Sequence, residues 1–112
     1  LTLEHVKALP YANAVVKESM RVRPPGWFVA REVAVPYVLR GATLRKGTQI
    51  FASPYLIHRH ADYFDAPDAF RPERWLDGLE QKLPRFAYAP FGGGQRMCIG
   101  SAFAMTMIGH LY

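Results

Sequence analysis

Cysteine is nearly absent from this sequence, since Cys98 is the only one in 112 residues. A single cysteine excludes an internal disulfide, and it suits either a reducing compartment or a thiol that is kept for chemistry. The chain is half hydrophobic, which is enough for one small core, and it is too short for two domains.

Long apolar runs and targeting signals are also lacking. No stretch of about 18 apolar residues occurs, so the sequence predicts no transmembrane helix. The start, LTLEHVKALP, lacks the basic and then apolar pattern of a signal peptide. We therefore expect a cytoplasmic protein, with a membrane anchor ahead of residue 1 as the alternative. The chain ends at IGHLY inside an apolar-periodic stretch without a stop signal, so we expect it to be part of a longer protein.

Runs of basic residues are missing as well, although the net charge is +5 and the sequence pI is about 9.7. A nucleic-acid-binding protein gathers its Lys and Arg residues into a patch or stripe. Here the basic residues are spread singly, so we expect no nucleic-acid partner. The positive charge instead indicates a solvated surface or one acidic partner.

The first segment is helical in pattern. Apolar residues at helical spacing predict one helix over residues 3–22, which Pro10 can interrupt. Pro24 and Pro25 disfavour helix in the residue before them, so the helix ends near Arg23. The expected apolar face consists of Tyr11, Ala14, Val15 and Val22.

Strand-like and irregular segments follow. WFVAREVAV is rich in β-branched and aromatic residues, and YVLRG and TLRKGTQIFAS predict short strands broken at Gly41 and Gly47. Residues 58–90 combine prolines, charges and aromatics, which predicts an ordered irregular coil with a short turn or two. After Cys98 the pattern predicts a final helix with a core-facing stripe. That stripe consists of Ala102, Phe103, Met105, Met107, Ile108 and Leu111.

One charged pair lies on the predicted helix. Glu18 and Arg21 are three residues apart, so they are neighbours on its surface. Glu18 also follows Ala14 by four residues and shares the apolar face. An exposed pair of little energetic weight is the commoner case. The alternative is a buried pair, in which the arginine holds the carboxylate with two parallel hydrogen bonds.

The stretch PFGGGQRMCIG, residues 90–100, surrounds the single cysteine with glycine. A phosphate-binding loop is excluded, because it needs G-x-x-x-x-G-K-S/T. The dinucleotide fingerprint fails at Met97, where its last glycine belongs. A zinc site is excluded because the chain has no second cysteine, and its four histidines do not stand at ligand spacing to Cys98.

Three interpretations of Cys98 remain. A nucleophilic thiol at the start of the last helix would need a histidine base that the local sequence does not supply. A buried, inert cysteine is the commonest case, but it leaves the glycines unexplained. A thiolate ligand to a flat metallocofactor uses the glycines for close approach and the helix N-terminus for N–H donors, with Arg96 available for cofactor carboxylates. Haem fits this third interpretation.

With these motifs in order, the chain closely resembles the C-terminal part of the cytochrome P-450 family, the haem-thiolate monooxygenases. The E-x-x-R motif of that family is matched by Glu18 and Arg21. Its P-E-R-F motif appears as P-E-R-W, with Trp75 in place of phenylalanine. Its loop motif F-x-x-G-x-R-x-C-x-G is matched at Phe91, Gly94, Arg96, Cys98 and Gly100.

The resemblance implies a mainly α fold with a small β region. Its parts in order are the E-x-x-R helix, short strands, an irregular meander, the cysteine loop and a final helix. Residues 1–112 would be a partial domain, truncated at both ends.

The resemblance also implies roles in the loop. Cys98 would be the catalytic residue and the axial iron ligand of haem b, iron protoporphyrin IX. Arg96 would pair with a haem propionate, and Phe91 would shield the sulfur. Gly94 would make the turn, and Gly100 would let the helix start pass close under the ring.

Further roles concern charged residues outside the loop. Glu18, Arg21 and Arg74 would form a buried charge network that holds the first helix to the coil. Strand alternation puts Arg31 on the face of its neighbours Val29 and Val33, where it points either inward or to solvent, and the resemblance favours a second propionate contact. His58 and Arg59 match a common dipeptide of the family. They are expected mainly to bond the coil, with a minor haem-side contact as the alternative.

The implied activity is that of a monooxygenase. It would insert one atom of O2 into a small apolar organic substrate, with electrons from NAD(P)H delivered by a ferredoxin or flavoprotein reductase. One alternative is a haem-thiolate isomerase, dehydratase or peroxygenase. The other is a non-catalytic fragment or interaction module, and we expect the isolated chain to be inactive.

Overall fold

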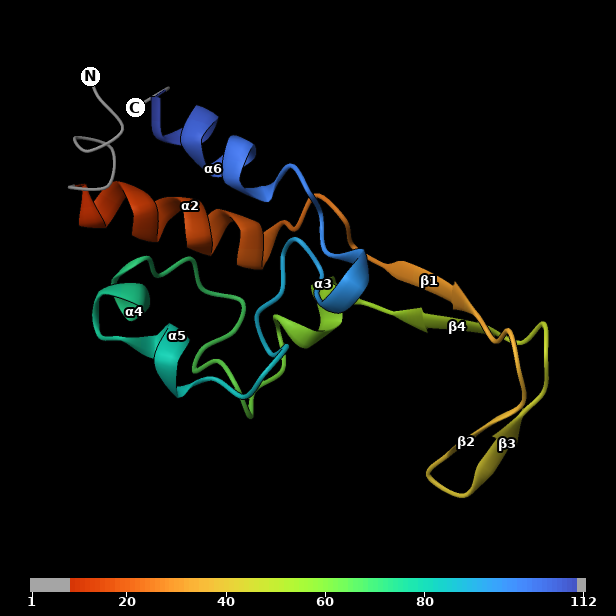
Figure 1. The fold of residues 1–112 in the computed structure, drawn as a ribbon. Helices are drawn as coiled ribbons and strands as arrows, with labels where there is room; N and C mark the ends of the chain where they lie inside the picture. Colours follow the sequence, from red (N-terminus) through yellow and green to blue (C-terminus); the bar gives the residue numbers. More distant parts are fainter. Residues whose placement is uncertain (1–8, 111–112) are drawn as a thin grey trace.

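The computed structural model describes residues 9–110 and consists of a helical part with a thin β extension that projects from it (Figure 1). The molecule is elongated, with extents of 51 × 30 × 20 Å. This mainly helical architecture with small sheets confirms the predicted fold class. Among the residues described, none of the helices is both long and apolar enough to cross a membrane.

Helix α2 spans Pro10–Val22 and forms the centre of the helical part. Pro10 is the first residue of this helix, a position that proline tolerates because the amides of the first turn have no partner within the helix. The helix ends at Arg23, as predicted, and the Arg23 amide donates to the Ser19 carbonyl at 2.7 Å. The predicted helical residues 3–8 lie outside the described part of the chain.

The buried face of α2 differs from the predicted one. Tyr11 is exposed, and Val15 and Val22 are only half-buried. The helix contacts α3, α4 and α6, so its covered surface is wider than a simple apolar stripe and is rotated from it. The buried residues are Ala14, Val16, Glu18, Met20 and Arg21.

The β extension contains two antiparallel pairs. Strand β1 (Val29–Glu32) pairs with β4 (Gln49–Ala52), and β2 (Tyr37–Leu39) pairs with β3 (Ala42–Leu44). The predicted breaks at Gly41 and Gly47 are confirmed, since both have a φ near +85° that suits glycine in a turn.

Between the strands and the cysteine lies a mostly irregular coil. It follows the short helix α3 (Pro54–Ile57) and contains two single-turn helices, α4 (Glu73–Leu76) and α5 (Leu79–Lys82), in agreement with the predicted coil and turns. This coil packs under α2 and supplies most of the small core. The core residues are Ala14, Phe64 and Trp75, with Leu79, Leu83 and Tyr88 packed against them.

The last helix, α6, spans Ser101–His110 and lies beside α2 (Figure 1). Its predicted core stripe is only partly covered among the described residues, since Met105 and Ile108 are half-buried. Phe103 is 70% exposed, Met107 is 48% exposed, and Ala102 is exposed as well. The main contact of this helix is with α2, and the exposed residues on its other side have no cover among the described residues. Leu111 lies outside the described residues.

Candidate functional site

A buried ion pair anchors the C-terminal half of α2. The guanidinium of Arg21 donates to the Glu18 carboxylate through Nε and Nη2, both at 2.9 Å. Neither side chain has any exposed surface. The structure thus has the buried, bidentate form of the pair, in which two parallel hydrogen bonds fix the orientation of both groups.

The Glu18 carboxylate has further donors from the coil. Oε2 accepts the indole N–H of Trp75 at 2.9 Å, and Oε1 accepts the Arg71 amide at 2.8 Å. Arg74 Nε lies 3.2 Å from Oε1. Burial by itself would raise the pKa of Glu18, but the hydrogen bonds from Arg21, Arg71 and Trp75 outweigh it and hold this pKa below its ordinary value.

Arg21 also reaches the coil through its remaining hydrogen atoms. Nη1 donates to the carbonyls of His58 at 2.9 Å and Pro67 at 2.6 Å, and Nη2 donates to Ala69 at 3.0 Å. Every nitrogen of the buried guanidinium therefore has an acceptor. We call the cluster of Glu18, Arg21, Trp75, Arg74 and the Arg71 amide the Glu18 lock, because it fastens α2 to the coil.

The cysteine loop, residues 90–100, takes its shape from backbone turns. Gly92 and Gly94 have φ values of +74° and +69°, in the left-handed region where a side chain is disfavoured. A short 3-10 helix, η1, covers Gly94–Arg96. The Cys98 amide donates to the Phe91 carbonyl at 3.0 Å, which closes the loop just before the cysteine side chain.

One glycine of the loop is in close contact with an aromatic ring. A Cβ added at Gly93 would lie 2.3 Å from a ring carbon of Phe86. Phe86 itself has a φ of +68°, an unusual conformation for a bulky residue. By contrast, a Cβ at Gly100 would meet only the Cys98 sulfur, at an ordinary 3.7 Å.

The reactive groups of the loop are open to solvent. Cys98 and Arg96 are exposed, and Phe91 is half-buried. Helix α6 begins at Ser101, three residues after the cysteine, as the sequence indicated. At this point the Ser101 amide donates to the Cys98 carbonyl at 3.4 Å, and the N–H donors expected for the sulfur stay a prediction.

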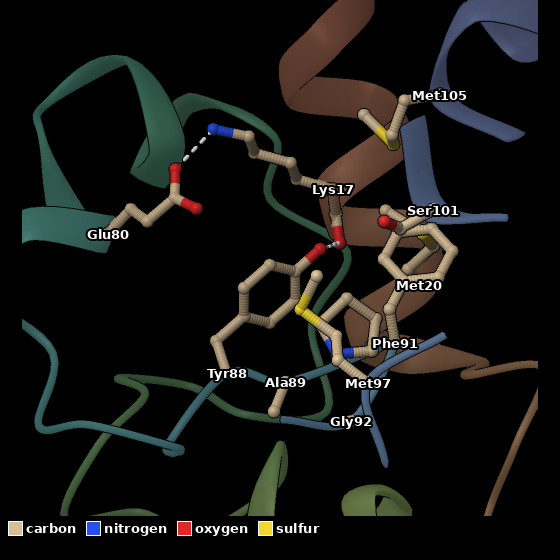
Figure 2. A pocket seen from close by; sticks show the side chains of 11 residues that line it. Lys17, Met20, Glu80, Tyr88, Ala89, Phe91, Gly92, Met97, Ser101 and Met105 are labelled. Carbon is tan, nitrogen blue, oxygen red and sulfur yellow. Dashed lines mark hydrogen bonds and ion pairs between the residues drawn. The ribbon is translucent and has the colours of Figure 1, made fainter. Parts of the chain in front are cut away.

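A hollow of about 270 Å³ lies between α2, the cysteine loop and α6 (Figure 2). Figure 2 shows the side chains of Tyr88, Phe91 and Met97 around it, with the Lys17–Glu80 ion pair at one side. The hollow is mostly apolar, and residues of α2, the cysteine loop and α6 line it.

His58 connects the coil to the base of the loop. It is 1% exposed, and its Nε2 accepts the Ala89 amide at 3.0 Å. Its neighbour Arg59 donates to the Val22 carbonyl at 2.6 Å, at the end of α2. Both side chains therefore bond the coil, which was the expected main role of this dipeptide.

The remaining predicted residues are only partly brought together. Glu18, Arg21 and Arg74 meet in one cluster, whereas Arg31 is exposed on β1 and donates to the Ala30 carbonyl. Strand β1 is exposed along its whole length in this chain, and the role of Arg31 toward a propionate stays a prediction. Sequence reasoning did not assign the Trp75 indole or the Arg71 amide to the cluster. The P-E-R-W motif was the available signal for the first.

The donor chemistry of the loop fits haem better than a bare metal ion. Within the described residues, no group of three or more His, Cys, Asp or Glu side chains could hold a metal. A thiol is instead exposed at the surface of a loop, next to an arginine and beside small and apolar residues. One sulfur ligand with apolar surroundings and a nearby cation is what a porphyrin with carboxylate groups requires.

Comparisons with known proteins agree on one family. The family model described as Cytochrome P450 matches residues 1–111. The chain is 38% identical to cyclooctat-9-en-7-ol 5-monooxygenase of Streptomyces melanosporofaciens, covering 94% of this chain and 23% of the relative. It is 45% identical to the mitochondrial 1,25-dihydroxyvitamin D(3) 24-hydroxylase of Mus musculus, covering 90% of this chain and 20% of the relative.

A solved structure shares the same arrangement. The retinoic acid-bound cyanobacterial CYP120A1 matches with a TM-score of 0.87 and 34% sequence identity, over 99% of this chain and 27% of that structure. The chain spans about a fifth of the length of the curated relatives that it matches.

Proposed function

Because this chain belongs to the cytochrome P450 family, we propose that it is the C-terminal, haem-binding part of a longer haem-thiolate monooxygenase. The observation that carries this proposal is the cysteine loop. Its turns at Gly92 and Gly94 present one exposed thiol, Cys98, on a backbone that is closed immediately before it. Such a loop can bring a sulfur ligand and little else against the face of a flat cofactor.

Each loop residue has a proposed task toward haem b. Cys98 would hold the iron through its thiolate sulfur, and Arg96 would pair with a propionate. Phe91 would shield the sulfur from water, and Gly100 would leave room beneath the ring. Haem held in this way supplies oxygen activation, because the electron-rich sulfur favours cleavage of the O–O bond.

The Glu18 lock supports the loop without touching it directly. Its hydrogen bonds hold α2 and the coil in one arrangement, and the coil leads into residue 90. A ligand loop must be held within a fraction of an ångström of its productive position. We therefore propose that the Glu18 lock stabilises the coil from which the cysteine loop extends.

The proposed substrate is a small apolar organic molecule, oxidised with O2 and with electrons from NAD(P)H. The printed names of two relatives, a monooxygenase and a hydroxylase, support an organic substrate. A ferredoxin or flavoprotein reductase would deliver the electrons, and the net charge of +5 suits an acidic partner. Exposed apolar residues such as Ile99 and Phe103 support the expectation that the chain alone holds haem weakly.

The carbon-monoxide difference spectrum of the reduced full-length protein tests this proposal. The wild type should bind one haem per chain and show the band that marks thiolate ligation. Cys98→Ser should lose that band while the protein stays folded by circular dichroism. A wild-type protein without haem, or an unchanged band in Cys98→Ser, would overturn the proposal.

A further inference from the structure

We propose that His58 is a positioning residue for the cysteine loop, and that it works only as a neutral imidazole that accepts the Ala89 amide. The inference rests on the proposed function, since the position of the loop matters for haem only if Cys98 binds it. His58 would act through the backbone of residues 89–92 and would not touch the cofactor.

His58 is the link between the Glu18 lock and the loop. Its backbone carbonyl accepts from Arg21 Nη1 at 2.9 Å, which fastens it to α2. Its ring Nε2 accepts the Ala89 amide at 3.0 Å, and the Ala89 carbonyl in turn accepts the Gly92 amide at 3.0 Å. A continuous series of hydrogen bonds therefore runs from the buried ion pair to the first left-handed glycine of the loop.

The imidazole is held in one orientation. Tyr88 packs against it with ring centroids 5.1 Å apart, and the Tyr88 hydroxyl donates to the Lys17 carbonyl at 3.0 Å. Tyr88 also packs against Trp75, at 4.5 Å between centroids. Because Nε2 accepts the amide, the ring hydrogen of neutral His58 must be on Nδ1.

The surroundings of His58 oppose a positive charge. Burial lowers the pKa of His58 to about 4, and the cations Arg21 on α2 and Arg59 beside it act in the same direction. Tyr88 is the titratable group that faces the ring from the coil. The backbone carbonyls of Met20 and Arg21 favour the charged form but do not outweigh burial.

Protonation would also remove the acceptor. A proton on Nε2 cannot coexist with the hydrogen bond from Ala89, so the charged ring must release the base of the loop. In the unfolded chain the ordinary pKa is 6.5, and in the folded chain it is about 4. The stabilisation from neutral His58 is therefore fully present above about pH 6.5, and it is lost as the pH falls from there toward 4.

Two substitutions in the full-length protein separate the acceptor from the titration. His58→Gln places an amide oxygen near the position of Nε2, which accepts a hydrogen bond and does not titrate. His58→Phe keeps a ring against Tyr88 and removes the acceptor. His60→Gln is the matched control, because the side chain of His60 is 57% exposed and pairs with Asp62.

Amide hydrogen exchange at Ala89 and the carbon-monoxide difference spectrum are measured together between about pH 7.5 and 3.5. In His58→Phe we expect Ala89 to exchange on the order of tenfold faster at neutral pH, with a reduced thiolate band. In the wild type the same changes should develop on acidification. His58→Gln should resist them, and His60→Gln should behave as the wild type.

Two results would overturn the inference. The first is unchanged Ala89 exchange in His58→Phe, and the second is the same acid transition in wild type and His58→Gln. The exchange measurement does not require haem. If the wild type binds none, the proposed function fails, while the role of His58 at Ala89 is still decided.

Discussion

The Glu18 lock and the cysteine loop belong to the same small structure, but the ion pair of the lock is buried and the thiol of the loop is exposed. In the lock, Glu18 and Arg21 are fully buried and every charged atom has a partner. In the loop, Cys98 and Arg96 are exposed, and backbone hydrogen bonds such as that from Cys98 to Phe91 maintain the turns. Side-chain hydrogen bonds fix the position of α2 in the lock, whereas glycine turns expose the Cys98 sulfur in the loop.

This difference between the lock and the loop shows which part of the structure can be rigid. A buried charge cluster is costly unless all of its members are satisfied, so it tolerates only one arrangement. A loop that must accept a cofactor cannot be filled by its own side chains. Its precision has to come from the structure behind it, and His58 lies at that junction.

Breaking the lock should have the largest effect. Arg21→Ala leaves the Glu18 carboxylate buried without its main partner, which costs about 3–5 kcal/mol in comparable cases. The unfolding midpoint and the soluble yield of the full-length protein measure this loss. Arg23→Ala, two residues away and exposed, should cost less than about 1 kcal/mol. Similar losses from the two substitutions would show that the lock is not a special anchor.

Changing the loop backbone should have an intermediate effect. Alanine at Gly94 would have to adopt a φ of +69°, at a cost of about 1–2 kcal/mol. We expect Gly94→Ala to lower haem retention more than it lowers the unfolding midpoint, because the strain acts on the ligand loop. Gly26→Ala is the control, since no atom lies within 4 Å of its Cβ position and its φ is not in the left-handed region. Loss of haem in both variants alike would contradict the assignment.

A surface ion pair should matter least. Lys17 and Glu80 pair beside the hollow, with side chains 29% and 47% exposed. Glu80→Gln should therefore change the free energy of unfolding by no more than about 1 kcal/mol, and by less at high salt. A loss as large as that of Arg21→Ala would mean that exposure does not separate the two kinds of ion pair.

Local sequence chemistry predicted the features that depend on one or two residues. The end of α2 at Arg23 follows from two prolines, and the strand breaks follow from Gly41 and Gly47. The proximity of Glu18 and Arg21 follows from helical spacing. Helical spacing could not show whether that pair is buried. The coil that covers it lies more than 30 residues further along the chain.

Features that depend on packing partners were harder to predict. The pattern placed Tyr11 and Val22 on the buried face of α2, but Val16 and Met20 are buried instead. The hydrogen bonds that connect Arg21, His58 and Ala89 could not be predicted either, because the sequence does not show which donor a histidine ring in a coil will bind.

The contact between Gly93 and Phe86 has a consequence for how this sequence can vary. The aromatic ring already fills the space that any side chain at position 93 would need, so an alanine there requires the ring to leave. The two sites therefore form an epistatic pair. Exchange of Phe86 for a small residue opens the space for an alanine at position 93, and that double replacement should be better tolerated than Gly93→Ala by itself.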